Sequence, residues 1–245
     1  MKIIISPAKK MMIEETIPWK TLPHFIEKTE QLKNYLSSLN IEDLKKLLAC
    51  NDSIAELNYE RYSSMDLKKN LSPAILSYDG IQYKYMSPSV FSDEYFRYIE
   101  NHLRIISGFY GILRPFDGIV PYRLEMQARL KTDFCRDLYD YWGDDIYKEL
   151  TRDDKTILNL ASSEYSKTIT KYAKNDAKII NCIFGEETDG KVREKGVYVK
   201  MARGEMVRYM AENAIEDLDG IRSFDRLGFS FSPERSDDSC YVFLK

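Results

Sequence analysis

The chain is poor in the residues that bind metals. It has two histidines, His24 and His102, and four cysteines in 245 residues, and the cysteines are far apart with no C-x-x-C pair. A zinc site of ordinary ligand spacing is therefore not expected. Scattered cysteines are typical of reduced thiols rather than of a disulfide framework. We predict no metal and no cofactor.

Long apolar runs are also missing. The N-terminal sequence MKIIISPAKK has only three isoleucines before a serine and a proline, which is too short for the apolar core of a signal peptide. No segment approaches the ~20 apolar residues that span a bilayer. No internal repeat, low-complexity tract or Gly/Ser linker divides the sequence. We therefore expect a cytoplasmic, monomeric protein with no membrane partner and a single domain over residues 1–245.

A strong excess of one charge is absent as well, but the charges are segregated. The formal net charge is -3, which argues against a protein that coats nucleic acid indiscriminately. Residues 191–208 have a local balance of +4, whereas residues 212–238 have a balance of -5. Lys2, Lys9 and Lys10 are not opposed by an acid before Glu14. This distribution allows a local basic face on an acidic chain. Alternatively, each run is the solvated face of an ordinary element.

The most distinctive segment is 103–126, LRIISGFYGILRPFDGIVPYRLEM. A short apolar strand leads into a loop that interleaves glycine, tyrosine and charge, and two prolines stiffen this loop. Tyr122, Arg123 and Glu125 place a hydroxyl, a guanidinium and a carboxylate within four residues. Loops with such a density of polar groups commonly line a site. Alternatively, Arg123 and Glu125 form a buried ion pair with a purely structural role.

Three further motifs accompany this segment: SPAK at 6–9, LNLASSEY at 158–165 and ARGEM at 202–206. With four separated motifs in this order, the chain resembles the YaaA family of bacterial peroxide-stress proteins over nearly its whole length. The resemblance implies a cytosolic single-domain protein of unusual α/β architecture, connected with survival under peroxide. It also implies DNA binding through a positively charged cleft and a helix-hairpin-helix. It implies no reaction.

The hydrophobic pattern predicts alternating strands and helices. Strands are expected at 2–6, 74–78, 103–107, 156–160, 178–184 and 197–199, with an antiparallel pair formed by 229–231 and 241–244. Helices are expected at 23–39, 41–49, 53–62, 92–102, 137–150, 162–173 and 202–215. This order predicts an α/β (α+β) fold with a mixed β-sheet flanked by helices.

The helical hairpin at about 41–62 lies where the family's helix-hairpin-helix is expected. Such a hairpin binds DNA by directing backbone N–H groups at a phosphate. Its connection at 50–52 lacks the usual glycine, and acids outnumber bases in the two helices. Asp52 or Ser53 is expected to cap the second helix, and the Asp52 carboxylate would repel a phosphate. A plain helical hairpin is therefore favoured, and other cations must supply much of any attraction to DNA.

Two helix starts have features of anion sites. Ser162 or Ser163 caps a helix directly after the strand at 156–160, and such junctions often bind anionic ligands. Arg203 is poorly placed for the helix dipole in the first turn of its helix, which indicates that a negative group holds it there. Gly204 permits close approach by a backbone or a ligand.

We place these polar residues around one cleft. The residues expected to bind DNA or another anion are Ser6, Lys9, Lys10, Arg104, Ser107, Tyr110, Arg114, Tyr122, Arg123, Ser162, Lys200, Arg203 and Arg208. In this hypothesis the cations contact phosphates, while Tyr110 and Tyr122 stack on unpaired bases. The catalytic residues are unknown, and Glu125, Glu164 and Lys9 are the candidates if a proton is moved.

The sequence thus predicts a DNA-binding protein of the peroxide stress response. It is expected to bind duplex or distorted DNA with low sequence specificity and to limit oxidative damage to it. The alternative is an enzyme that acts on a nucleotide-like or other anionic small molecule in the same cleft. Because the sequence has no established catalytic motif, binding without catalysis is preferred.

Overall fold

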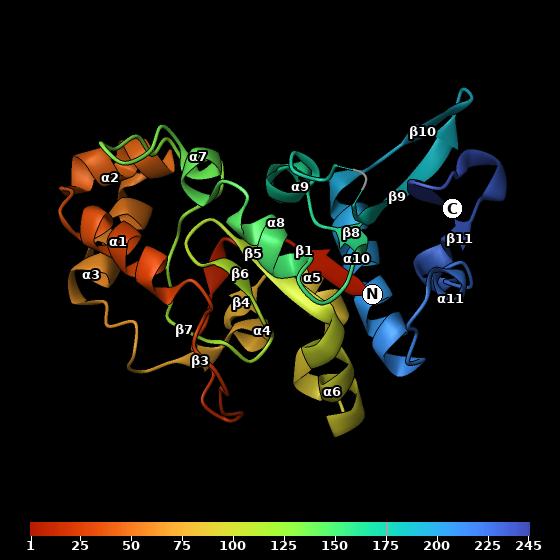
Figure 1. Cartoon of the computed structure of the whole chain (residues 1–245), viewed down its shortest axis with the longest axis horizontal. Coiled ribbons are helices and arrows are strands. Elements are labelled where there is room, and N and C mark those ends of the chain that lie inside the picture. The colour runs from red at the N-terminus through yellow and green to blue at the C-terminus, as the bar shows by residue number, and fades with distance from the viewer. Residues whose placement is uncertain (175) are drawn as a thin grey trace.

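The computed structural model describes residues 1–174 and 176–245 and has a mixed sheet at its centre (Figure 1). The strand order is β11-β12-β9-β8-β1-β5-β6, and β10 pairs with β9 outside this path. β1 (Lys2–Ile5) lies between β5 (Leu103–Ser107) and β8 (Thr156–Leu160) and is parallel to both. The three isoleucines of β1 are fully buried, so both faces of the sheet are covered, as is usual for parallel strands.

The outer strands make the sheet mixed. β9 (Lys178–Thr188) is parallel to β8, and β12 (Cys240–Leu244) is parallel to β9. β6 (Gly111–Leu113) and β11 (Ser230–Phe231) are antiparallel to β5 and β12. β10 (Lys191–Arg193) forms a hairpin with β9 that extends away from the body of the molecule (Figure 1). The predicted mixed sheet flanked by helices is confirmed.

The helices gather on either side of this sheet, and none in the described ranges is long and apolar enough to cross a membrane. They are α1 (Ile26–Ser37), α2 (Ile41–Leu48), α3 (Asp52–Ser64), α4 (Ala74–Ser77), α5 (Ile81–Met86), α6 (Asp93–His102), α7 (Leu138–Trp142), α8 (Asp145–Leu150), α9 (Ser163–Thr170), α10 (Gly196–Glu212) and α11 (Leu218–Ile221). Helices α1 to α3 lie at one end of the molecule, and β9 to β12 lie at the other (Figure 1). Short strands form two small ladders: β2 (Lys10–Met11) with β4 (Tyr78–Asp79), and β3 (Ser72–Pro73) with β7 (Gly118–Ile119).

Three predicted elements differ from the structure. The expected strand at 74–78 forms helix α4, and only its last residue belongs to β4. Every residue of α4 is buried, and a short run that is buried on all sides cannot be assigned to strand or helix by its periodicity. The expected strand at 197–199 is the first turn of α10. The expected helix at 137–150 divides into α7 and α8 at Gly143, where φ is +50°.

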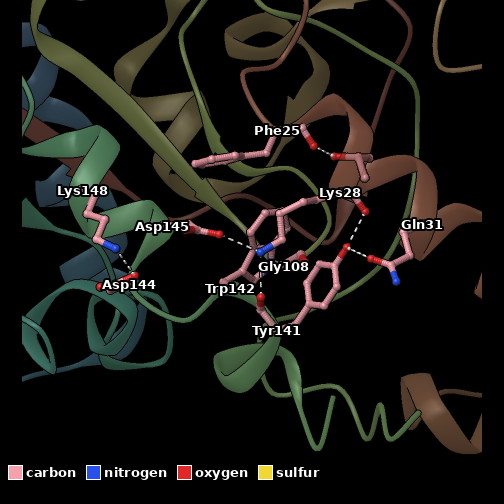
Figure 2. A network of polar contacts seen from close by, with 10 residues as sticks. Phe25, Lys28, Gln31, Gly108, Tyr141, Trp142, Asp144, Asp145 and Lys148 are labelled. Carbon is pink, nitrogen blue, oxygen red and sulfur yellow. Dashed lines mark hydrogen bonds and ion pairs between the residues drawn. The ribbon is translucent and has the colours of Figure 1, made fainter. Parts of the chain in front are cut away.

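Trp142, at the end of α7, holds the turn between β5 and β6. Its indole N–H donates a hydrogen bond to the Gly108 carbonyl oxygen at 2.9 Å. Its ring also packs against Gly111, where φ is +75° and a side chain would overlap the ring. On the other side, Lys28 of α1 forms an ion pair with Asp145 of α8 at 2.7 Å (Figure 2). Contacts with Trp142 of α7 thus fix the turn between β5 and β6, which lies in the first half of the distinctive 103–126 block.

Candidate functional site

A cavity of about 430 Å³ opens at the carboxyl ends of β1 and β8. The chain leaves these parallel strands at Ser6 and Ser162, and the last residues of the strands, Ile5 and Leu160, are register partners. The Ser6 hydroxyl oxygen accepts a hydrogen bond from the Ser162 backbone N–H at 2.8 Å. The two loops therefore meet at the edge of the sheet where open α/β proteins bind ligands.

Four sequence motifs that are far apart in the chain contribute to this cavity. Of the residues that we predicted to bind an anion, it is lined by Ser6, Lys9, Lys10, Tyr122, Arg123, Ser162, Lys200 and Arg203. The candidate catalytic residues Glu125 and Glu164 line it as well. The structure thus brings together most of the residues that sequence analysis grouped into one cleft.

Arg104 and Arg114 lie elsewhere. They line a second, smaller cavity of about 170 Å³ together with Asp117. Arg104 is close to the amino end of β5, whereas the main cavity opens at the carboxyl ends of the parallel strands. Its guanidinium donates hydrogen bonds to the carbonyl oxygens of Glu100 (3.1 Å) and Leu103 (2.6 Å). The Arg104 guanidinium is thus hydrogen-bonded to the backbone of residues that are close to it in the sequence.

Arg208 is also outside the main cavity. It lies on α10 and forms an ion pair with Glu212 of the same helix at 2.7 Å. It is five residues beyond Arg203, whereas Lys200 and Arg203, three residues apart, share a face of the helix. Arg208 is therefore a paired cation on the same helix as Lys200 and Arg203 that does not line the main cavity.

Ser107, Tyr110 and Tyr122 belong to a buried polar cluster. Ser107 is fully buried, and Tyr110 and Tyr122 are 1% and 3% exposed, so neither ring has a face free for a base to stack on. The Tyr122 hydroxyl is 2.6 Å from Ser107 Oγ and 2.8 Å from the Tyr78 hydroxyl. Burial raises the pKa of Tyr122 to about 12, so its hydroxyl stays protonated at neutral pH.

Arg123 and Glu125 form an ion pair in the cavity wall. Glu125 Oε1 is 3.0 Å from Arg123 Nη2 and 3.1 Å from Lys9 Nζ. The side chains of Arg123 and Glu125 are 14% and 15% exposed, whereas that of Lys9 is 69% exposed. Arg123 Nε and Glu125 Oε2 are buried and lack hydrogen-bond partners among the described residues. The pair that we considered as a structural alternative is thus present, and it also faces the cavity.

Glu164 is the second carboxylate of the cavity. Its Oε1 accepts a hydrogen bond from the Gln127 backbone N–H at 3.1 Å. Burial raises the pKa of Glu164, and the nearby negative charge of Glu125 acts in the same direction. Glu164 therefore holds its proton to a higher pH than an exposed glutamate does.

The end of β4 and the start of α5 supply cavity residues, 79–83, that sequence analysis did not single out. Asp79 forms ion pairs with Lys10 at 2.7 Å and Lys84 at 3.3 Å. The Tyr83 hydroxyl donates a hydrogen bond to the Ser6 carbonyl oxygen at 2.9 Å. The Asp-Gly pair at 79–80 indicated only a turn, and no local pattern showed that this turn would pack beside the SPAK loop.

Lys200 and Arg203 are cations of the basic run 191–208 that line the cavity. Lys195 is neutralised by Glu186 at 2.7 Å and Arg193 is 3.8 Å from Asp189. Within residues 1–174 and 176–245, no carboxylate lies within 4.0 Å of Lys200 or Arg203, and the buried Arg203 Nε has no hydrogen-bond partner. Three of the six cations of this run, Arg193, Lys195 and Arg208, are thus paired with carboxylates. Lys200 and Arg203 line the cavity, whereas Lys191 lies on the β9–β10 hairpin.

Gly204 sets the position of Arg203. A Cβ atom at Gly204 would overlap the Gln82 carbonyl oxygen and lie 2.9 Å from the Met86 backbone nitrogen. The absence of a side chain therefore lets α10 pack directly on the backbone of α5. We predicted that a backbone or a ligand would come close to Gly204, and the structure shows that it is the backbone of α5.

The first turn of α9 also faces the cavity. Ser162 is the N-cap residue, as predicted, but its side chain makes no capping hydrogen bond because its hydroxyl lies beside Ser6 Oγ at 3.3 Å. The Tyr165 and Ser166 N–H groups donate to the Ser162 carbonyl oxygen at 3.0 and 2.9 Å, and the Glu164 carboxylate in this turn already complements the helix dipole.

The α2–α3 hairpin adjoins the loop that carries Arg123. The Tyr62 hydroxyl donates to the Arg123 carbonyl oxygen at 2.7 Å. Ala49 adopts a left-handed conformation, with φ of +47°, at a position where glycine is usual. The cap of α3 is Asn51, whose side chain accepts from the Ile54 N–H, so the predicted cap at Asp52 or Ser53 is wrong. Asp52 pairs instead with Lys45 at 2.5 Å.

Comparisons with known proteins assign the chain to a family. The family model described as "Peroxide stress protein YaaA" matches residues 1–235. An UPF0246 protein of Desulfitobacterium hafniense is 65% identical over 100% of this chain and 98% of its own length. UPF0246 proteins of Lachnoclostridium phytofermentans and Pediococcus pentosaceus are 52% and 47% identical over 100% of this chain and 96% and 98% of their own lengths. The chain therefore belongs to the peroxide stress protein YaaA family, which supports a role in the peroxide stress response.

Proposed function

We propose that the protein serves the peroxide stress response by binding DNA at the mouth of the main cavity, with low sequence specificity. The observation that carries this proposal is the pair of cations on α10. Lys200 and Arg203 line the cavity, and no carboxylate in the described parts of the chain is within 4.0 Å of either. Unpaired cations attract phosphates at any base sequence, because the backbone carries the charge.

Further exposed cations lie along the loop that joins the cavity to the α2–α3 hairpin. The Arg129 backbone N–H donates to the Leu47 carbonyl oxygen at 3.0 Å, and Gln127 contacts Glu164 of α9, so this loop runs between the hairpin and α9. Lys131 on the loop and Lys167 on α9 are exposed. They extend the positive surface beyond the cavity and provide contacts for a DNA backbone.

A salt titration tests the proposal. With about four to six phosphates contacted, the logarithm of the association constant should fall with the logarithm of salt concentration at a slope of roughly -4 to -5. Lys200→Ala should weaken binding and make the slope shallower by about 1. Arg208→Ala is the matched control on the same helix, because its cation is already paired with Glu212. A flat salt response, or equal losses in the two variants, would exclude α10 as a DNA contact.

An enzyme acting on an anionic small molecule is the second candidate, and the acids of the cavity favour it. Glu125 and Glu164 line the same cavity as Lys200 and Arg203. The raised pKa of Glu164 suits a group that donates and accepts a proton. Replacing Glu164 with Gln distinguishes the candidates. A DNA-binding protein should keep or gain affinity for DNA and keep peroxide protection, whereas an enzyme should lose protection with its DNA affinity unchanged.

A further inference from the structure

The cavity lining carries cations and carboxylates on different elements. Lys200 and Arg203 of α10 supply positive charge that is not paired with a carboxylate in the described residues. Glu125, in the 103–126 block, and Glu164, in the first turn of α9, supply carboxylates. A ligand that matches both sets has one anionic group and a body that can donate hydrogen bonds to carboxylates, such as hydroxyl or amino groups.

Arg203 favours an anionic group on the ligand. A largely buried charge without a partner is costly, and proteins compensate such charges with a counter-ion or a hydrogen-bond acceptor. Arg203 Nε is buried, and no acceptor in the described residues reaches it. The tight packing of Gly204 on α5 keeps α10, and hence this guanidinium, in position. A ligand anion would compensate the charge.

The size of the cavity limits the ligand. A volume of about 430 Å³ lies in the range of ~300–1,000 Å³ that small organic ligands occupy, so an inorganic anion alone would leave most of it empty. The carboxylates of Glu125 and Glu164 would repel a second phosphate. A phosphate is favoured over a carboxylate because it offers more acceptor oxygens to a guanidinium and an ammonium together.

We infer that the cavity binds a small phosphate monoester, up to about the size of a nucleoside monophosphate. Its phosphate contacts Lys200 and Arg203 of α10, and its hydroxyl or amino groups face Glu125 and Glu164. This inference deepens the proposed function and uses the same cavity. The ester is either a free metabolite or a terminal or unstacked nucleotide of a DNA strand, and the two sources share this chemistry.

Calorimetric titration with four probes tests the inference. AMP and ribose 5-phosphate carry a phosphate and a hydroxyl-bearing body, adenosine lacks the phosphate, and inorganic phosphate lacks the body. At least one of the two esters should bind, at least about tenfold more tightly than adenosine and inorganic phosphate, which is about 1.4 kcal/mol. Equal affinity of the esters and adenosine, or no ester binding at about 10 mM, would overturn the inference.

Variants of the α10 cations test whether the phosphate of the ester binds there. Lys200→Ala and Arg203→Gln should each weaken ester binding by about tenfold or more, whereas Arg208→Gln should leave it unchanged. Arg203 is largely buried, so Lys200, whose side chain is exposed, provides the variant that should fold normally. Ester binding that is insensitive to Lys200→Ala in a normally folded protein would place the phosphate elsewhere and overturn the assignment.

Competition between the esters and labelled DNA separates this inference from the proposed function. Displacement of a 5′-phosphorylated single strand by AMP would assign the site to a nucleotide of a strand, whereas ester binding without DNA binding would assign it to a free metabolite and refute the DNA proposal. DNA binding that depends on Lys200, with no ester bound, would overturn the inference and leave the DNA proposal standing.

Discussion

At the scale of single residues, Arg123 is expected to be important for stability because of its partner. Removing Arg123 leaves the Glu125 carboxylate largely buried with only the exposed Lys9 ammonium beside it. Arg123→Ala should therefore lower the free energy of unfolding by about 3 kcal/mol, near the lower end for a broken buried pair. Lys9→Ala should cost less than about 1 kcal/mol. Urea denaturation measures both.

The double variant Arg123→Ala/Glu125→Gln is the control for this prediction. The double variant also removes the negative charge of Glu125, which Arg123→Ala leaves without its partner. It should therefore regain much of the stability lost in Arg123→Ala. If Arg123→Ala and Lys9→Ala cost equally little, the pair is effectively solvated and the desolvation argument is wrong.

Asp117 should make stability depend on pH. Burial raises its pKa from 3.8 to about 6, so the folded state binds the proton more tightly than the unfolded chain. The stabilisation is fully present below about pH 4 and is lost as the pH rises through about 6. Between pH 5 and pH 7 the wild type should lose about 1 kcal/mol relative to Asp117→Asn. The free energy of unfolding of both proteins at the two pH values measures this, and a constant difference would contradict it.

At the scale of elements, the contact between α10 and α5 depends on Gly204. Gly204→Ala would place a methyl group on the Gln82 carbonyl and near the Met86 nitrogen, and both atoms belong to the backbone and cannot rotate away. The substitution should cost about 1–3 kcal/mol or more. Gly196→Ala is a matched control on the same helix, because a Cβ there would meet nothing within 4 Å, and it should be neutral or slightly stabilising. Thermal melting of the two variants compares them, and equal effects would refute close packing.

The turn between α2 and α3 contains a strained alanine. Ala49 has φ of +47° and ψ of +53°, a conformation that costs an L-residue with a side chain about 1 kcal/mol. Ala49→Gly should therefore stabilise the protein by up to about 1 kcal/mol in chemical denaturation. Ala55→Gly, in the interior of α3, should destabilise it. Loss of stability in Ala49→Gly would indicate that the methyl group makes a compensating contact.

The sequence predicted most elements of the sheet, and it failed where packing with the rest of the chain decided the local structure. β1, β5 and β8 were predictable because each is a mainly apolar segment of strand length. The segment 74–78 is also mainly apolar, but residues 74–77 form α4, because a site buried on all sides imposes no period on the sequence. Residues 197–199 are β-branched or aromatic, yet they extend α10, whose packing on α5 outweighs local preference.

At the scale of the whole molecule, the grouping of site residues was predictable where topology was simple. Ser6 and Ser162 each follow a strand of one parallel pair, so their meeting follows from the strand order. Arg104 was grouped with them because it lies in the same distinctive block as Tyr122. Arg104 lies near the amino end of β5 and lines the smaller cavity. The main cavity opens at the opposite end of the parallel strands, so the two groups of residues do not meet. The positive run at 191–208 was misleading for a related reason, since the partners Glu186 and Glu212 lie outside it.

The cysteines bear on how the whole molecule serves peroxide resistance. A redox-sensing cysteine needs an exposed thiol with a lowered pKa. Burial raises the pKa of all four thiols, Cys50, Cys135, Cys182 and Cys240, so each is less reactive than a free cysteine at neutral pH. Protection should therefore not depend on any of them.

Single replacements by alanine should leave survival under peroxide largely intact at unchanged protein levels, whereas Lys200→Ala should reduce it if the main cavity is the working site. Cys50 is the most stringent test of this prediction, because the charges of Arg123 and Glu125 act on its thiol. The Arg123 guanidinium lowers the pKa of the Cys50 thiol, although burial outweighs this effect. Survival assays with each variant, alongside immunoblots of the protein, measure the effect. Loss of protection in Cys50→Ala with normal protein levels would show that a thiol beside the cavity takes part, and would replace charge-based binding with redox chemistry as the basis of resistance.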